Sequence, residues 1–394
     1  MAIARNYPAL FVPRTGKDMQ RAMNLLAVTI FLSGDVMTGR GIDQVLPHPS
    51  LPRIYEPFIT DAKEYVRLSE KAFGPIPKPA GFTAVWGDAM AELDRAAPDV
   101  RVINLETAVT KSEDYWKGKG INYRMNPANV PVLSAAGINV ATLANNHVLD
   151  WGYAGLVETV ETLTKHRIRC AGAGKDRNEA EAPAIVDVGG RSRVIVFSFA
   201  VATSGVPDAW AATSGRPGVN LLPDLSRDTI QRIRDQVRQV KRQGDIVIAS
   251  IHWGPNWGYG ISADETRFSR GLIDDAGVDI IHGHSSHHVK AIEVYHGRLI
   301  LYGSGDLLND YEGISGQEAF RGDLGLMYFA RVDPATGKLL SLEMTPTQVR
   351  HFRVNRASPV DARWIADVLN REGKDRGTSV VVVDGNRLEL KWKE

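Results

Sequence analysis

The amino-acid sequence predicts a layered α/β fold, and three observations lead to that prediction. Short runs of apolar and β-branched residues recur along the chain at the lengths typical of buried strands. Several of these runs are separated by segments with the apolar spacing of amphipathic helices. Clusters of histidine, carboxylate and amide side chains come directly after several runs, where an open α/β sheet places its ligand crevice.

The strand and helix predictions follow the chain in order. Buried strands are predicted at residues 27–33, 100–104, 138–144, 193–200, 245–251, 278–282 and 298–304. Helices are predicted at residues 126–137, 153–167, 225–244 and 263–277. The third helix has Ser226 and Asp228 near its start and Gly244 at its end, which are typical capping residues. After about residue 320 the pattern changes to two strands joined by a turn, then a helix from about residue 359 and a final hairpin.

These elements predict one main domain at residues 26–330, with β/α additions at 331–394 packed on the same domain. Residues 45–90 contain seven prolines and are predicted to form an inserted, lid-like segment over one face. Residues 1–25 are predicted to be an N-terminal extension. Basic residues there precede an apolar run, as in an export signal, but the run lacks a small-residue cleavage pattern and is too short to span a bilayer. The run is therefore interpreted as the first buried strand.

Composition excludes several classes of protein. Lys plus Arg (47) nearly balances Asp plus Glu (46), so no strong net field favours nucleic acid or an anionic membrane. Cys170 is the only cysteine, which excludes an intrachain disulfide and a thiolate metal cluster. A cytoplasmic protein without a membrane span is therefore expected, with export by a cryptic N-terminal signal as the alternative. The sequence does not predict an oligomeric state.

Histidines are concentrated in one place: His282, His284, His287 and His288 lie within seven residues, although the chain has ten histidines. Polar clusters follow five predicted strands: SGDVMTGRG, NLET, NNHVLDWG, HWGPNWGYG and HGHSSHH. Because such loops converge on one rim, their carboxylate, amide and imidazole groups are expected to meet. The predicted metal ligands are Asp35, Glu106, Asn146, His252 and His284. Such donors suit a divalent ion, here Mn, Zn, Fe or Ca.

Each of these residues also has a structural interpretation. Asp35 alone could cap a turn, Asn146 could satisfy turn backbone, and a single histidine such as His252 after a strand is more often structural than functional. Five clusters at five strand ends are hard to explain in this way. The joint pattern favours a metal site.

Five ordered segments carry a resemblance to a known family: GDVMTGRG, INLETAVT, ATLANNHVLDWG, SIHWGPNWGYG and HGHSSHHVKAIEVYHGRLILYGSGDLLNDY. They resemble the poly-γ-glutamate capsule-synthesis (CapA-type) family, which is related to the calcineurin-like metallophosphoesterases. The resemblance covers about residues 26–330. It implies a four-layer α/β/β/α sandwich with its site at the strand ends. Members of the family often carry an N-terminal membrane anchor, which this sequence does not show.

The resemblance also implies roles for individual residues. Asp35 matches the metal-binding aspartate of the first motif, but Met37 stands where the phosphoesterases have a histidine. Glu106 takes the place of a bridging aspartate and is one methylene longer. Asn146 and His147 match the Asn-His pair in which the amide binds metal and the imidazole faces the reacting group.

The last two motifs match in part. His252 matches the lone histidine of the fourth motif, and Gly283 and His284 match the start of a Gly-His-x-His motif. Ser286 replaces the second histidine of that motif, with His287 one place later. These departures favour one ion, or one tight ion and a weaker second one.

Three functions remain open at the sequence level. The first is metal-assisted hydrolysis or transfer at an amide or phosphoester of a peptide or γ-glutamyl substrate, with His147 and His287 transferring protons and Asp150 orienting His147. The second is a metal-dependent peptide epimerase that uses His/Asp pairs on opposite faces of a Cα. The third is a non-catalytic accessory protein that binds poly-γ-glutamate for a partner synthetase.

Further residues are assigned supporting roles. Aromatic walls with an arginine suit a peptide-like substrate that carries a carboxylate. The predicted substrate-binding residues are Arg40, Trp253, Trp257 and Tyr259. The residues predicted to support the histidines are His282, Asp306 and Asp310.

Overall fold

The structure is a computed structural model that describes residues 27–393. Its larger sheet has ten strands, with β1 and β2 at its centre, and runs in the order β20-β21-β18-β17-β1-β2-β5-β6, with β16 beside β1 and β19 beside β18. The strands are β1 (Val28–Val36), β2 (Val100–Leu105), β5 (Val140–Thr142), β6 (Arg169–Ala171), β16 (Asp306–Leu308), β17 (Leu324–Val332), β18 (Leu339–Val349), β19 (Val354–Arg356), β20 (Thr378–Val383) and β21 (Arg387–Trp392).

The second sheet has seven strands in the order β11-β9-β12-β13-β15-β14, with β8 beside β9. Its strands are β8 (Ala184–Val188), β9 (Ser192–Val201), β11 (Leu221–Leu222), β12 (Ile246–His252), β13 (Ile280–His284), β14 (Ile292–Tyr295) and β15 (Arg298–Leu301). Two small ladders join β3 (Ala108–Val109) to β4 (Arg124–Met125) and β7 (Ala173–Gly174) to β10 (Gly218–Val219).

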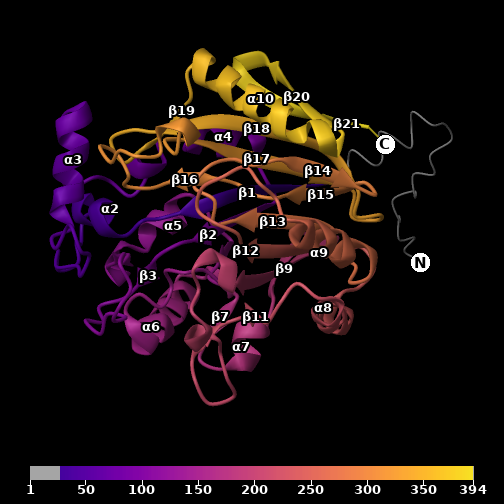
Figure 1. Ribbon diagram of the computed structural model, residues 1–394, viewed down its shortest axis with the longest axis horizontal. Coiled ribbons are helices and arrows are strands. Elements are labelled where there is room, and N and C mark those ends of the chain that lie inside the picture. The colour runs from indigo at the N-terminus through magenta and orange to yellow at the C-terminus, as the bar shows by residue number, and fades with distance from the viewer. Residues whose placement is uncertain (1–26, 394) are drawn as a thin grey trace, which may run out of the picture.

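Helices cover the outer faces of both sheets. The α-helices are α2 (Arg40–Val45), α3 (Lys63–Phe73), α4 (Ala89–Ala96), α5 (Pro131–Ala135), α6 (Gly152–Lys165), α7 (Arg177–Glu181), α8 (Arg227–Val240), α9 (Ala263–Asp274) and α10 (Pro359–Gly373). In Figure 1, α10, β20 and β21 lie along the top of the molecule, next to β18. Among the described residues, no helix has the length and hydropathy that crossing a membrane requires.

Alternating side chains of the central strands divide the core into layers. Phe31 of β1 packs with residues of α4, α5 and α6, whereas Ile30 and Leu32 face the space between the sheets. Val194 of β9 faces the same space, and the next residue, Ile195, packs with residues of α8 and α9. The order is therefore helices, sheet, sheet, helices, which confirms the four-layer α/β/β/α sandwich.

The predicted strands and helices are present, with ends that differ by a few residues. Ser226 caps α8, since its side chain accepts a hydrogen bond from the backbone N–H of Thr229. The tail from residue 331 is joined to the larger sheet through β17, which begins before that position and pairs antiparallel with β1. Within residues 45–90 the structure contains α3 and one turn of 3₁₀-helix. The predicted extension at residues 1–25 lies outside the described residues.

The register of the strands brings the polar clusters together. In the larger sheet Asp35 lies beside Asn104 and also beside Asp306, and in the second sheet His252 lies beside His284. The carboxyl ends of these parallel strands therefore meet at the junction of the two sheets. The topology, and not proximity in sequence, assembles the site.

Gly34 provides a test of how closely the backbones approach at this junction. A Cβ atom at Gly34 would lie 1.8 Å from the carbonyl oxygen of Gly305. That carbonyl accepts a hydrogen bond of 3.0 Å from the N–H of Asp35, so the two segments cannot separate without losing it. We expect Gly34→Ala to lower the free energy of unfolding by about 1–3 kcal/mol in urea denaturation. Gly81→Ala, at a position where nothing lies within 4 Å of a Cβ, should leave the free energy of unfolding nearly unchanged. Equal losses of stability in the two variants would refute the close approach of the backbone at Gly34 as the cause.

Candidate functional site

A cavity of about 1060 Å³ opens over the junction of the two sheets. Asn146, His147 and His287 are part of its lining, together with Arg40 and Trp257, so five of the predicted site residues border one open space. The other predicted ligands lie buried near them. The cavity is therefore the route by which a substrate would reach the histidines.

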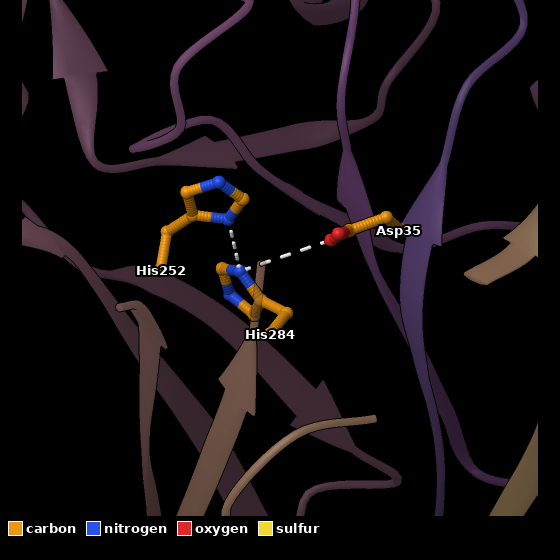
Figure 2. A group of neighbouring side chains, drawn as sticks. All are labelled: Asp35, His252 and His284. Carbon is orange, nitrogen blue, oxygen red and sulfur yellow. Dashed lines mark hydrogen bonds and ion pairs between the residues drawn. The ribbon is translucent and has the colours of Figure 1, made fainter. Parts of the chain in front are cut away.

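Asp35, His252 and His284 form the innermost group of possible metal ligands (Figure 2). The Nδ1 atoms of the two imidazoles lie 2.8 Å apart, and the Nδ1 atom of His284 lies 3.9 Å from Asp35 Oδ1. All three side chains are buried. They come from β1, β12 and β13, so both sheets contribute.

Glu106 and Asn146 lie on the side of this group nearer the cavity. Glu106 Oε1 is 3.8 Å from Nε2 of His252 and 4.0 Å from Nε2 of His147. Asn146 Oδ1 is 3.1 Å from Nε2 of His252. Asp35, Glu106 and His287 form a second group whose ligand atoms lie close enough to share an ion. Asp35 belongs to both groups of possible ligands, so its carboxylate could contribute to either group.

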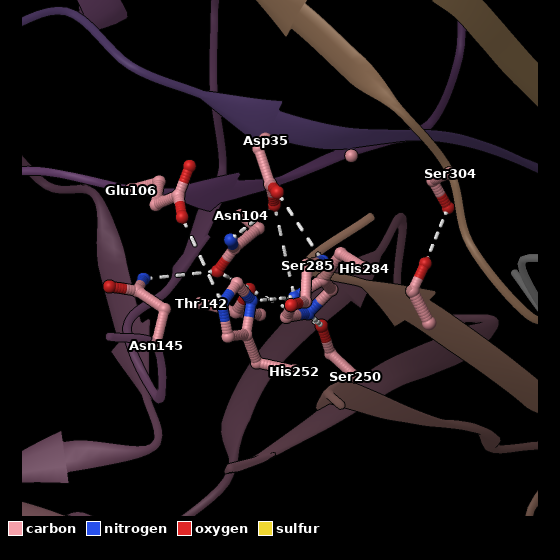
Figure 3. A network of polar contacts seen from close by, with 12 residues as sticks. Asp35, Asn104, Glu106, Thr142, Asn145, Ser250, His252, His284, Ser285 and Ser304 are labelled. Carbon is pink, nitrogen blue, oxygen red and sulfur yellow. Dashed lines mark hydrogen bonds and ion pairs between the residues drawn. The ribbon is translucent and has the colours of Figure 1, made fainter. Parts of the chain in front are cut away.

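A network of hydrogen bonds fixes the direction of these side chains (Figure 3). Asn104 donates to Asp35 Oδ1 at 2.6 Å, and the N–H of Ser285 donates to its other oxygen at 3.3 Å. Ser250 Oγ lies 2.8 Å from Nε2 of His284, which turns the Nδ1 atom of that ring toward Asp35. The donor atoms are held in place before any ligand arrives.

The carboxylates of this site are destabilised in their charged form. Burial, together with repulsion from Asp306, raises the pKa of Asp35 to about 7. Burial and the charge of Asp35 raise the pKa of Glu106 well above its ordinary value. A cation among these groups would relieve both effects, because it restores a favourable partner to each carboxylate.

The buried imidazoles are in the form that binds metal. Burial lowers the pKa of both His252 and His284 well below the ordinary value, so both rings are neutral at pH 7. Neutral imidazole and carboxylate oxygen together form a donor set for Mn, Fe or Zn, and carboxylate with amide oxygen also suits Ca. The residues present therefore fit a divalent ion.

His147 is held by a carboxylate and an ammonium group. Its Nδ1 lies 2.7 Å from Asp150 Oδ2 and 2.9 Å from Lys119 Nζ. A hydrogen on Nδ1 that is directed at the carboxylate would leave the lone pair on Nε2. Lys119 Nζ lies 2.6 Å from the other oxygen of Asp150. Burial and the nearby Lys119 charge lower the pKa of His147 well below its ordinary value, which leaves this imidazole neutral.

His287 has the opposite charge state. Its Nδ1 lies 2.9 Å from Asp306 Oδ1, and Asn309 donates to the second oxygen of that carboxylate. Burial works against the charged ring, but the Asp306 carboxylate outweighs burial and raises the pKa of His287 to about 10. One cavity therefore presents a neutral imidazole and a protonated one.

Two tyrosines set the spacing between these histidines. The ring of Tyr123 stacks on His147 with centroids 3.8 Å apart, and Tyr311 meets His287 edge-on at 5.3 Å. The two phenol oxygens lie 2.8 Å apart and share a hydrogen bond. The tyrosine pair therefore connects His147 to His287.

The structure shows the partners of Arg40 and corrects the role expected for Asp310. The Arg40 guanidinium is buried and donates to Asp310 and Glu56, but the residue belongs to the cavity lining, so its contact with a substrate stays a prediction. Asp310 also accepts the N–H of Gly41 and supports Arg40, not a histidine. The Arg40 guanidinium lies over the rings of Tyr65 and Tyr123.

Of the aromatic residues predicted to bind substrate, one lines the cavity and two do not. Trp253 is buried, and its indole N–H donates to the carbonyl of Tyr302, which corrects its predicted role in substrate binding. Tyr259 packs against His288 and does not belong to the cavity lining, so its role is corrected too. Trp257 does line the cavity, with its ring 5.5 Å from the ring of His287.

The remaining residues show how this chain departs from the phosphoesterase motifs. Met37 packs in the apolar core and offers no ligand atom where those enzymes have a histidine. Ser286 Oγ donates to the carbonyl of His288. His282 lies with its Nε2 atom 2.8 Å from the carbonyl of Ser33, so it joins the two sheets and is a support, as expected from its position.

Sequence reasoning missed Lys119, Tyr123 and Tyr311. Lys119 and Tyr123 lie on the loop between Glu106 and α5, where the stretch YWKGKGINY mixes basic, aromatic and glycine residues. Such a composition next to a ligand motif could have indicated a binding loop. Tyr311 ends the last matched segment, but nothing in the sequence indicates that it faces Tyr123.

We expect the purified protein to bind a divalent ion in stoichiometric amount when supplied with Mn, Zn or Ca. Asp35→Ala and His284→Ala should each abolish that binding, because each removes a donor that no neighbour replaces. Elemental analysis by mass spectrometry measures the metal content. His296→Ala, on the surface beside Asp274, is the matched control and should retain the ion. Full metal content in both site variants would show that the ion binds elsewhere.

Comparison with known proteins agrees with the sequence resemblance. Residues 29–311 match the family model described as bacterial capsule synthesis protein PGA_cap. A probable polyglutamine synthesis accessory protein of Mycobacterium tuberculosis is 48% identical, over 92% of this chain and 96% of that protein. The PGA biosynthesis protein CapA of Bacillus subtilis is 31% identical over 54% of each chain. A novel phosphatase from Mycoplasma pneumoniae is similar with a TM-score of 0.44 and 11% identity, over 86% of this chain and 96% of that one. The chain belongs to the bacterial capsule synthesis PGA_cap family.

Proposed function

We propose that the chain is a metal-dependent enzyme that hydrolyses or transfers an amide-type bond in a peptide or γ-glutamyl substrate. One observation carries this proposal: two imidazoles, each held by a carboxylate, border the same cavity beside a buried cluster of metal donors. An acid–base catalyst requires a proton acceptor and a proton donor at one site, and these two histidines would supply them.

Asp35, Glu106, Asn146, His252 and His284 would hold the ion. When bound, a divalent cation supplies Lewis-acid polarisation of a carbonyl or phosphoryl oxygen and lowers the pKa of water. The network around Asn104 and Ser285 keeps the donors oriented. Burial of the whole group excludes bulk solvent and so strengthens the electrostatic interactions there.

Proton transfer is assigned to the two histidines. The lone pair on Nε2 of His147 accepts a proton, and Asp150 stabilises the imidazolium that forms. The Nε2–H of protonated His287 donates a proton to the leaving group, while Asp306 holds its Nδ1–H. The tyrosine pair keeps both rings on the same cavity.

The names of two relatives support the γ-glutamyl substrate class. One is described as a polyglutamine synthesis accessory protein and another as a PGA biosynthesis protein, which motivates the γ-glutamyl member of the proposed class. The peptide member rests on the cavity itself, which is large enough for several amino-acid residues.

Epimerisation is the second candidate, and the same histidine pairs favour it. Inversion at a Cα requires one base that removes a proton and one acid that returns a proton from the other face. His147 and His287, which line one cavity, would supply the base and the acid. The two candidates differ in outcome, because epimerisation leaves the backbone intact and exchanges the Cα hydrogen with solvent.

We expect His147→Ala and His287→Ala each to lower turnover by about 10²–10⁴-fold, since each removes a general acid or base. The assay uses Mn-loaded protein with phosphoester, γ-glutamyl and peptide substrates in D₂O, followed by mass spectrometry. Cleaved product supports hydrolysis or transfer, and intact product with deuterium at Cα supports epimerisation.

Both variants should retain the ion, which separates proton transfer from metal binding. His296→Ala serves again as the control and should keep full activity. Wild-type activity in both histidine variants would contradict the assignment. No turnover of any substrate by the metal-loaded wild type would favour a non-catalytic accessory role.

A further inference from the structure

Large apolar side chains are exposed around the mouth of the cavity. Phe58 is 96% exposed, Ile314 51%, Phe73 40% and Ile121 38%, and all four belong to the lining. Among the described residues eight large apolar side chains are exposed, so half of them gather at this one opening. We call these four residues the apolar rim. Exposed apolar residues collected at a cavity mark a binding surface more often than chance exposure does.

The rim is built from separate segments of the chain. Phe58 and Phe73 come from the inserted segment around α3, Ile121 from the loop that carries Lys119, and Ile314 from the loop after β16. Leu68 of α3 also lines the opening. Several segments therefore present apolar side chains to one space, as a binding site requires and a single poorly packed loop does not.

The charged side chains of the lining cancel one another. The lining contains four Lys or Arg residues and four Asp or Glu residues. Lys119 is paired with Asp150, and Arg321 is paired with Asp323. Glu312 accepts the N–H groups of the segment at 351–352. Arg40 is paired with Asp310 and Glu56, and the Arg350 guanidinium lies over the Phe73 ring at 4.8 Å. A chain of free carboxylates would need a series of cations without such partners.

The rim is continuous with the catalytic end of the cavity. Trp257 lines the same space, with its ring 5.5 Å from that of His287. A group that reaches His287 through the opening would therefore have the apolar indole surface beside it.

We infer that the apolar rim is a specificity subsite for an uncharged aliphatic or aromatic side chain next to the reacting centre. The substrate is then a short peptide-like molecule with an apolar residue, and not a polymer with a carboxylate on every unit. This inference rests on the proposed function, since it refines the substrate of the same site. The occupant belongs to the substrate because the rim and the two histidines border one cavity.

Binding of four dipeptides to the Mn-loaded full chain tests the subsite. The probes are alanyl-phenylalanine, alanyl-glutamate, γ-glutamyl-phenylalanine and γ-glutamyl-glutamate, measured by isothermal titration calorimetry. Each phenylalanine member should bind at least about tenfold more tightly than its glutamate partner. Equal affinities, tighter binding of the glutamate members, or no binding by any probe would overturn the inference.

Variants of the rim assign the preference to these residues. The double variant Phe58→Ser with Ile314→Ser changes two exposed side chains and should reduce phenylalanine binding to the glutamate level while leaving glutamate binding unchanged. Val360→Ser, on α10 and outside the lining, changes a side chain that is 71% exposed, between Ile314 and Phe58 in exposure, and should change nothing. A preference that survives in the rim variant would overturn the assignment.

Two further outcomes are distinguishable. Because affinity is measured without turnover, a rim-dependent preference in a protein that turns over none of the substrates would refute the proposed function and leave the subsite standing. Sedimentation velocity tests whether the apolar rim is instead a contact between two copies of the chain. A wild-type dimer that the rim variant converts to a monomer would assign the rim to a second copy of the chain and overturn the inference.

Discussion

The contact between the carboxyl ends of β1 and β13 is the constraint on which the rest of the site depends. It joins the two sheets where Asp35 and His284 face each other, and His282 bonds across the junction to the carbonyl of Ser33. Each sheet alone would present only part of the donor set. Every proposed role therefore depends on the packing of one sheet against the other.

The junction of the two sheets buries several carboxylates close together, which is electrostatically unfavourable when they are charged. Asp35, Glu106 and Asp306 are buried near one another, and the imidazoles beside the first two are neutral. Burial raises the pKa of both Asp35 and Glu106, so their charged forms are unfavourable without a further cation. Stability is not the natural explanation for such a group, because buried carboxylates without a full complement of cations oppose folding. A divalent ion bound among them would account for the cluster and its burial, and the neutral histidines are in the form that binds metal.

The sequence predicted the fold well, and it predicted which polar side chains the strand ends bring together, because both follow from local patterns. Strands such as β12 are apolar runs that end in a polar residue, and parallel strand ends converge by topology alone. Roles that depend on side-chain partners were not predictable in this way. Arg40 looked free for substrate, but Asp310 and Glu56 come from distant segments to pair with it. Trp253 directly follows His252, yet its ring packs in the core with residues of α8 and α9.

The most direct test of this account is the anomalous diffraction of Mn²⁺ in crystals of the purified full chain. The account predicts a peak bonded to Asp35, His252 and His284, at the junction of the two sheets. At saturating Mn²⁺, no peak there, with the two imidazoles still in direct contact, would contradict the metal centre.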